Sequence, residues 1–171
     1  MTPLPFPLPS LRSALIVLLS AALISACGFR PRGSITLPED FASVYVQAPI
    51  EISDELAIFL DGGGATVTES RKDADAVIRV QSENYEQRVT SVDATTGKAR
   101  EFELIYALNF SVRMKDGTAL VPSERLVVRR IYAFDPTAVI GATRNVEALR
   151  VDMRRDAAER IIRLTEAALS P

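Results

Sequence analysis

The sequence has no histidine, and its only cysteine among 171 residues is Cys27. Histidine is the most common general acid–base group and metal ligand, so its absence removes the usual basis for both kinds of site. A single thiol cannot form a disulfide within the chain, and once Cys27 is modified no thiol remains as a nucleophile or metal ligand. We therefore expect no catalytic residues, no metal site and no cofactor.

Lysine is also scarce, and the three lysines, Lys72, Lys98 and Lys115, all fall in segments expected to be loops or turns. A serine nucleophile would need one of them as its base, because the chain has no histidine. Glu101 and Glu103 form the other candidate acid–base pair. Nothing in the sequence indicates a pocket that would raise the pKa of either glutamate, so we expect solvated surface charges. The sequence therefore predicts a protein that is not an enzyme.

No strong excess of positive charge is present, since the formal net charge is −2 at pH 7. Removal of residues 1–26 would take away one basic side chain, Arg12, and lower the charge to −3. A weakly acidic chain lacks the electrostatic footprint of a nucleic-acid-binding protein. We therefore expect no nucleic-acid partner.

The longest apolar run, Ala14–Ala26, has thirteen residues and follows Arg12. A membrane-spanning helix needs roughly 20 apolar residues, so this run is too short to cross a bilayer. A basic residue, a short apolar stretch and small residues at its end are typical of a secretory signal peptide. We expect residues 1–26 to be that signal peptide.

The end of this run, Ile24-Ser25-Ala26-Cys27, matches the lipobox of bacterial lipoproteins. Small residues before the cysteine admit the peptidase, and the thiol is the group that receives the lipid. The alternatives are an ordinary signal peptide that contains a cysteine and a core helix with a buried one. We expect Cys27 to be lipidated, which would tether the chain to a membrane. In a Gram-negative bacterium Gly28 favours the outer membrane, because aspartate at that position favours retention in the inner membrane.

Alternating apolar and polar residues predict four strands in the remaining chain. The clearest alternation runs from Phe102 to Met114, which indicates a strand with one face on a core and the other in water. Turn sequences at Asp93–Lys98 and Asp116-Gly117 join the last three strands as an antiparallel meander. The four expected strands lie within Phe41–Ala48, Ala76–Gln87, Glu101–Met114 and Arg125–Phe134.

Apolar residues three and four positions apart predict two helices. We expect Ser53 to cap a short helix that ends at Gly62-Gly63-Gly64. A long helix is expected from about Arg144 to Leu169, with Thr143 as its cap. Its predicted apolar stripe is Val146, Leu149, Met153, Ala157, Ile161, Leu164 and Ala168.

These elements predict an α/β (α+β) two-layer sandwich, in which a four-stranded, mostly antiparallel sheet carries both helices on one face. We expect a single domain over residues 39–171. Residues 27–38 contain Pro31, Gly33 and Pro38, and we interpret them as the lipidated N-terminus and a tether.

Basic residues gather around the expected central hairpin and on the strand after it. Arginine suits the planar, bidentate binding of phosphates, so an anionic amphiphile is one candidate ligand. The alternative is a solvated sheet face with cross-strand pairs to Glu101 or Glu103. Arg130 interrupts an apolar face, so it lies at the sheet rim or pairs with a carboxylate. The basic residues are Arg88, Lys98, Arg100, Arg125, Arg129 and Arg130.

Several segments, taken in order, resemble the family of the lipopolysaccharide-assembly lipoprotein LptE. Cys27–Gly33 is similar to the family's Cys-Gly-aromatic…Arg-Gly opening, and Glu101–Leu104 to part of its central hairpin. No single motif is specific, but the ordered set extends from Cys27 to about Leu164. The other matching segments are Leu37-Pro38, Tyr45-Val46, Ser91-Val92, Gly97, Arg130-x-Tyr132-x-Phe134-Asp135 and Met153–Ala158.

The resemblance implies a non-enzymatic, lipid-anchored protein on the periplasmic side of the outer membrane. It would plug the β-barrel LptD, support the folding of that barrel and help to deliver lipopolysaccharide. The family's lipopolysaccharide contacts are basic residues near the hairpin tip and before the last helix. The tip here has no base before Gly97, so the nearest substitutes are Lys98 and Arg100, with Arg144 at the helix. The alternative is a lipid-anchored binding or scaffold module of another cell-envelope complex.

Overall fold

The computed structural model describes residues 35–134 and 139–170, with side chains from Arg144 onward in the second segment. The expected signal peptide, residues 1–26, and the expected lipidation site, Cys27, lie outside the described residues. The elements are η1 (Glu39–Phe41), β1 (Ser43–Gln47), α2 (Ile50–Gly62), β2 (Thr66–Val67), β3 (Ala76–Val92), β4 (Ala99–Met114), β5 (Ala119–Ala133) and α3 (Val139–Leu169).

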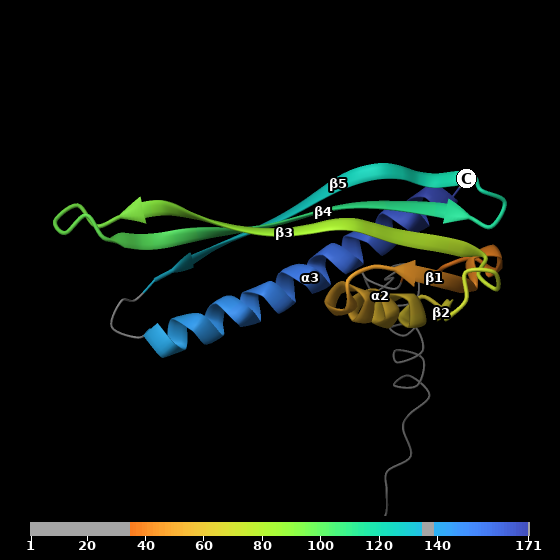
Figure 1. Ribbon diagram of the computed structural model, residues 1–171, viewed down its shortest axis with the longest axis horizontal. Coiled ribbons are helices and arrows are strands. Elements are labelled where there is room, and N and C mark those ends of the chain that lie inside the picture. Colours follow the sequence, from red (N-terminus) through yellow and green to blue (C-terminus); the bar gives the residue numbers. More distant parts are fainter. Residues whose placement is uncertain (1–34, 135–138, 171) are drawn as a thin grey trace, which may run out of the picture. The chain divides into compact units, whose positions relative to one another are not determined.

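The sheet has five strands in the order β2-β1-β3-β4-β5 (Figure 1). β3, β4 and β5 form the predicted antiparallel meander, whereas β1 runs parallel to both β2 and β3. The predicted α+β class is confirmed, but the predicted strand number was wrong by one. The extra strand, β2, contains only two residues, which is too short for alternation along the sequence to reveal it.

A β-bulge in β3 changes which side chains face the core. Val80 lies opposite Phe110, but Ser82 already lies opposite Asn109, so Gln81 is an extra residue in β3. Because side chains alternate between faces, one inserted residue moves the following side chains to the other face. Tyr85 consequently lies opposite the buried Tyr106.

Both helices lie on the same face of the sheet, as predicted (Figure 1). Side chains from α2, α3 and the covered face form one hydrophobic cluster. Leu56 of α2, Met153 of α3 and Phe110 of β4 are all fully buried in it. None of the helices in the described part has the length and the apolar run that a membrane crossing requires.

α2 begins four residues earlier than predicted, so Ser53 is not its cap. The helix starts at Ile50 after Pro49, and the amide of Ser53 donates a hydrogen bond to the Pro49 carbonyl at 2.9 Å. A proline just before a helix has no amide hydrogen that would need a partner there. The predicted glycine stop is confirmed: α2 ends at Gly62, and Gly64 adopts the left-handed conformation with φ of +90°.

α3 also begins earlier than predicted, at Val139, so Thr143 lies within the helix and does not cap it. Its buried stripe is shifted as well, because Leu164 is 38% exposed and Ala168 is exposed. α3 packs against α2 as well as the sheet, and this second contact turns a different side of its last turns inward. The buried residues are Met153, Ala157, Ala158, Ile161, Ile162 and Thr165.

The segment before η1 packs onto this domain. Ile35 and Leu37, which fall in the segment expected to be a tether, are buried in the hydrophobic cluster. The Leu37 amide donates a hydrogen bond to the Gly63 carbonyl at 3.0 Å. The Thr36 amide donates one to the Glu166 carboxylate at 3.0 Å. The core of the domain therefore reaches back to Ile35.

Candidate functional site

The hairpin of β3 and β4 extends past the ends of β5 and α3 (Figure 1). Its turn, Asp93–Lys98, closes with a 2.8 Å hydrogen bond from the Asp93 amide to the Lys98 carbonyl. The Asp93 carboxylate accepts hydrogen bonds from the amides of Thr96 and Thr95 at 2.9 and 3.0 Å. These bonds, led by the one from the Thr96 amide, lower the pKa of Asp93. The turn is therefore an ordered tip, as its composition predicted.

The structure places two of the three predicted lipopolysaccharide contacts at this tip. Lys98 is exposed in the turn, and Arg100 is the second residue of the return strand, with its side chain 68% exposed. The Arg100 guanidinium lies 3.8 Å from the Asp93 carboxylate. Arg144 is exposed in the first turns of α3, which lie apart from the tip (Figure 1). The fold therefore groups Lys98 with Arg100 but does not place Arg144 beside them.

A cluster of aromatic rings and guanidinium groups joins the hairpin to α3. The rings of Tyr85 and Tyr106 stack with centroids 4.5 Å apart. The Arg150 guanidinium lies 5.2 Å from the Tyr85 ring centroid, within the range of a cation–π contact. Arg154 donates a hydrogen bond to the Tyr85 hydroxyl at 3.3 Å. Sequence reasoning missed this cluster, because the bulge in β3 hides that Tyr85 faces the core.

A second aromatic cluster lies further along the hairpin. Phe102 stacks on Tyr132 at 5.7 Å and meets Phe134 edge to face at 5.5 Å. Val89 lies opposite Phe102 and is 53% exposed. The hairpin therefore keeps an apolar surface beyond the main core, next to its charged tip.

Most arginines considered for an anionic amphiphile are engaged in ion pairs. Arg88 lies 2.6 Å from Glu86, and Arg129 lies 3.3 Å from Glu103 on the neighbouring strand. The cross-strand pairing considered from the sequence is thus confirmed for Glu103. These guanidinium groups already have an anionic partner, which leaves them less available for a ligand.

The face of the sheet opposite to α2 and α3 has no described element over it, and we call it the open face (Figure 1). It is largely polar. Side chains on it include Arg79, Gln81, Glu103, Arg113 and Arg129. The domain therefore presents one long polar surface that its own described elements leave uncovered.

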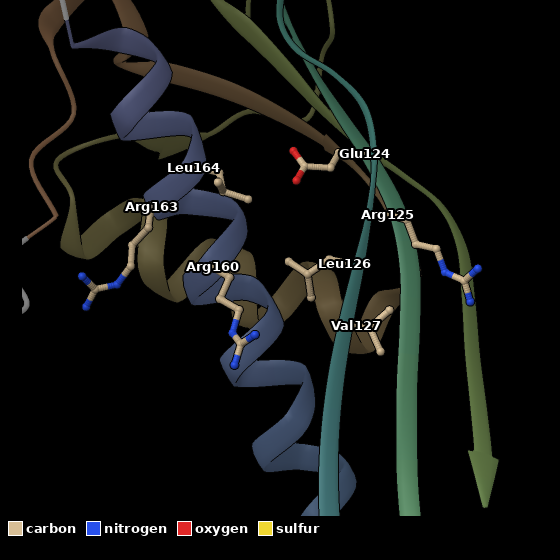
Figure 2. A pocket seen from close by; sticks show the side chains of 7 residues that line it. All are labelled: Glu124, Arg125, Leu126, Val127, Arg160, Arg163 and Leu164. Carbon is tan, nitrogen blue, oxygen red and sulfur yellow. The ribbon is translucent and has the colours of Figure 1, made fainter.

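A groove of about 430 Å³ lies between the edge strand β5 and α3. Figure 2 shows Leu126 of β5 and Leu164 of α3 pointing into the space between the two elements, whereas Arg125 points away from it. Arg160 and Arg163 belong to its α3 wall. The groove thus combines an apolar centre with charged margins.

Every described carboxylate whose pKa departs clearly from its ordinary value has a lowered pKa. Hydrogen bonds from Ser43 lower the pKa of Asp75, and bonds from the Thr118 amide lower that of Asp116. A hydrogen bond from Arg88 lowers the pKa of Glu86. These groups are ionised at neutral pH, so they act as hydrogen-bond acceptors and not as general acids. No group of three or more metal-binding side chains occurs in the described part.

A model of the family LptE, lipopolysaccharide-assembly, matches residues 41–165 of the chain. No curated protein sequence matches this chain. The matched segment contains all five described strands, α2, and α3 as far as Thr165, so it covers most of the domain.

Solved structures with the same fold include several bacterial lipoproteins. An uncharacterized lipoprotein B from Nitrosomonas europaea is 28% identical, with a TM-score of 0.65 over 80% of this chain and 88% of that one. A rare lipoprotein B from Shewanella oneidensis is 25% identical, with a TM-score of 0.61 over 71% and 91%. A minor lipoprotein from Acinetobacter baumannii is 20% identical, with a TM-score of 0.61 over 74% and 92%, and shows the fold alone.

Proposed function

Because the chain belongs to the LptE family of lipopolysaccharide-assembly proteins, we propose that it is an outer-membrane lipoprotein that plugs and supports the LptD β-barrel. Its role lies in lipopolysaccharide assembly. The finer proposal, a plug inside the barrel, rests mainly on one observation, the long polar open face of the sheet.

The chemistry of the open face suits a barrel interior. Large outer-membrane barrels have a polar lumen, so a plug needs a polar surface toward the barrel wall. Arg79, Glu103 and Arg129 are examples of charged side chains on this face. An apolar face would instead pack poorly against such a lumen, because the wall's polar groups would lose water without gaining partners.

The length of the hairpin also suits this position. β4 contains 16 residues, which at about 3.3 Å per residue span about 50 Å. The apolar band of an outer-membrane barrel is only about 25 Å tall. A hairpin of this length, inserted along the barrel axis, would carry its tip through the depth of the membrane.

The proposed role requires no bond to be made or broken by this chain. Its perturbed carboxylates serve turns and ion pairs, as Asp93 and Asp156 do. We therefore propose a structural and carrier role without enzymatic activity. Lys98 and Arg100 would bind lipopolysaccharide at the tip, and Arg144 would contact it separately.

Lipidation at Cys27 would hold the domain at the periplasmic side of the outer membrane. The lipoprotein names of the structures from Nitrosomonas europaea and Shewanella oneidensis support this proposal. Several acyl chains bind a bilayer stably, whereas one binds only marginally. Cys27→Ala should release the protein from membranes on fractionation, and retention in the membrane would contradict the proposed anchor.

The function is tested by depletion of the protein in its own bacterium, with surface lipopolysaccharide and folded LptD measured together. Folded LptD should fall because the barrel loses the protein that supports its folding. Surface lipopolysaccharide should fall because less of it is delivered through the barrel. Unchanged levels of both would reject the proposal and favour a scaffold of another envelope complex.

The tip is tested by the double variant Lys98→Ala/Arg100→Ala in binding assays with purified lipopolysaccharide. Affinity should fall by about tenfold or more, since two charge-assisted contacts are lost. Arg155→Ala/Arg163→Ala removes the same charge from α3 and should leave the affinity nearly unchanged. Equal affinities for the two variants would move the lipopolysaccharide site away from the tip.

A further inference from the structure

Three arginines surround one hollow on the open face of the sheet. Arg79 comes from β3, Arg113 from β4, and Arg71 from the loop after β2. The hollow has a volume of about 180 Å³. Strand register supports this grouping, because Arg79 lies opposite Ser111 on β4 and Arg113 lies opposite Val77 on β3. The backbone therefore holds two of the three arginines on adjacent strands.

These arginines differ from Arg88, Arg100 and Arg129 in having no acidic partner among the described residues. No described carboxylate lies within ion-pair distance of Arg71, Arg79 or Arg113. Arg113 makes one long hydrogen bond, 3.4 Å, to the Gly117 carbonyl. Three like charges around a small space repel one another, and a bound anion would offset that repulsion. The chain as a whole is weakly acidic, so net charge does not explain the gathering of arginines.

The other groups that line the hollow indicate which kind of anion it suits. Ser111 and Ser123 contribute hydroxyl groups, and Gln47 contributes an amide. Hydroxyls and amides donate to further oxygen atoms once the guanidinium groups have bound theirs. A carboxylate offers only two oxygens, whereas a phosphate monoester offers three and carries up to two negative charges. Three guanidinium groups with two hydroxyls match the phosphate better.

We propose that this hollow binds a phosphate group, either as free phosphate or as the monoester headgroup of a lipid. About 180 Å³ is smaller than a typical pocket for a drug-sized ligand, so the hollow takes the phosphate while the remainder of a larger molecule stays outside. Arg79 and Arg113 bind its oxygens from the sheet, and Arg71 closes over it from the loop. This site is separate from the hairpin tip, and its test needs no barrel partner.

The test uses the full lipidated chain in a neutral detergent, titrated with inorganic phosphate and with dihexanoyl phosphatidic acid. Dihexanoyl phosphatidylcholine, a phosphodiester of equal chain length, corrects for partition into micelles. The variant Arg79→Gln/Arg113→Gln should weaken binding by about tenfold or more, because two charged donors are lost. Arg155→Gln/Arg163→Gln, with the same loss of charge on α3, should bind as the wild type does.

The two ligands distinguish the two sources. Binding of inorganic phosphate that is weakened by the variant supports a site for the group alone, and binding of phosphatidic acid only supports a lipid headgroup. Arg71→Gln, which changes only the loop, should also weaken binding. It replaces the double variant in the test if that variant does not fold. Failure of both ligands to bind, equal binding by the two double variants, or equally tight binding of acetate would overturn the proposal.

Discussion

Arg130 of β5 and Asp156 of α3 form an ion pair, with the guanidinium Nη2 2.9 Å from the carboxylate Oδ2. Arg160, one turn further along α3, binds the same carboxylate at 2.7 Å. Burial raises the pKa of Asp156, but the hydrogen bonds from Arg160 and Arg130 outweigh it, so the pKa is lowered overall. The ion pair with Asp156 explains how a charged residue, Arg130, can lie on the apolar face of its strand.

This pairing predicts a pH-dependent contribution to stability. Asp156→Asn should lower the free energy of unfolding at pH 7 by about 1 kcal/mol, since the pair is partly exposed to solvent. The folded-state pKa lies below the unfolded value of about 3.9, so the contribution is complete above that value and is lost as the pH falls through the folded pKa. Denaturant unfolding of both proteins between pH 7 and pH 3 measures the difference.

Asp152→Asn is the matched control for this prediction. Asp152 is exposed on the same helix and pairs with no cation among the described residues. Its substitution should change stability by less than about 0.5 kcal/mol at any of these pH values. Equal losses for the two variants would show that the Asp156 ion pairs do not contribute.

The contact between α2 and the sheet depends on a few fully buried side chains. Leu56→Ala should lower the free energy of unfolding by about 2–5 kcal/mol, because Leu56 is 0% exposed and its removal leaves a cavity. Ile58→Ala, two residues away at a 60% exposed position, should cost less than about 0.5 kcal/mol. Thermal or denaturant unfolding compares them, and similar losses would contradict the orientation of α2.

The stacked pair Tyr85 and Tyr106 predicts opposite effects for one chemical change. Tyr85→Phe removes the acceptor of the Arg154 hydrogen bond and should lower stability by about 1 kcal/mol. The Tyr106 hydroxyl is buried, and no hydrogen bond of good geometry to a described residue satisfies it, so Tyr106→Phe should be neutral or stabilising. Chemical unfolding at pH 7 measures both, and a large loss for Tyr106→Phe would contradict the described surroundings of that hydroxyl.

The same pair predicts an alkaline effect. Burial, followed by the negative charge of Glu83, raises the pKa of Tyr106 well above its ordinary value of about 10. Above pH 10 the hydroxyl loses its proton more easily in the unfolded chain than in the folded one. The free energy of unfolding is therefore unaffected by this group below pH 10 and falls as the pH rises toward the folded pKa. The advantage of Tyr106→Phe over the wild type should therefore grow above pH 10. A constant difference up to pH 11 would contradict this assignment.

Much of the fold could be predicted because β4 alternates without interruption from Phe102 to Met114. The same reasoning failed where local sequence does not decide the outcome. β2 has two residues and exists only because it pairs with β1. The buried stripe of α3 is set by its contact with α2 as well as the sheet, so Leu164 is exposed although its spacing fits the stripe.

The candidate site could be predicted less completely. Lys98 and Arg100 share the hairpin tip because they are neighbours in sequence. The contact of Tyr85 with Arg150 and Arg154 requires both the bulge at Gln81 and the packing of α3, and no local pattern reports either. The hollow around Arg79 likewise depends on strand register.

The central claim, that this chain is the partner of the LptD barrel, is tested most directly by affinity purification. The tagged, lipidated protein is extracted from outer membranes with a mild detergent, and the proteins that purify with it are identified and quantified. We predict LptD in a one-to-one ratio with the chain, as expected for a plug. Recovery of the chain alone, or with a different envelope complex, would contradict the account.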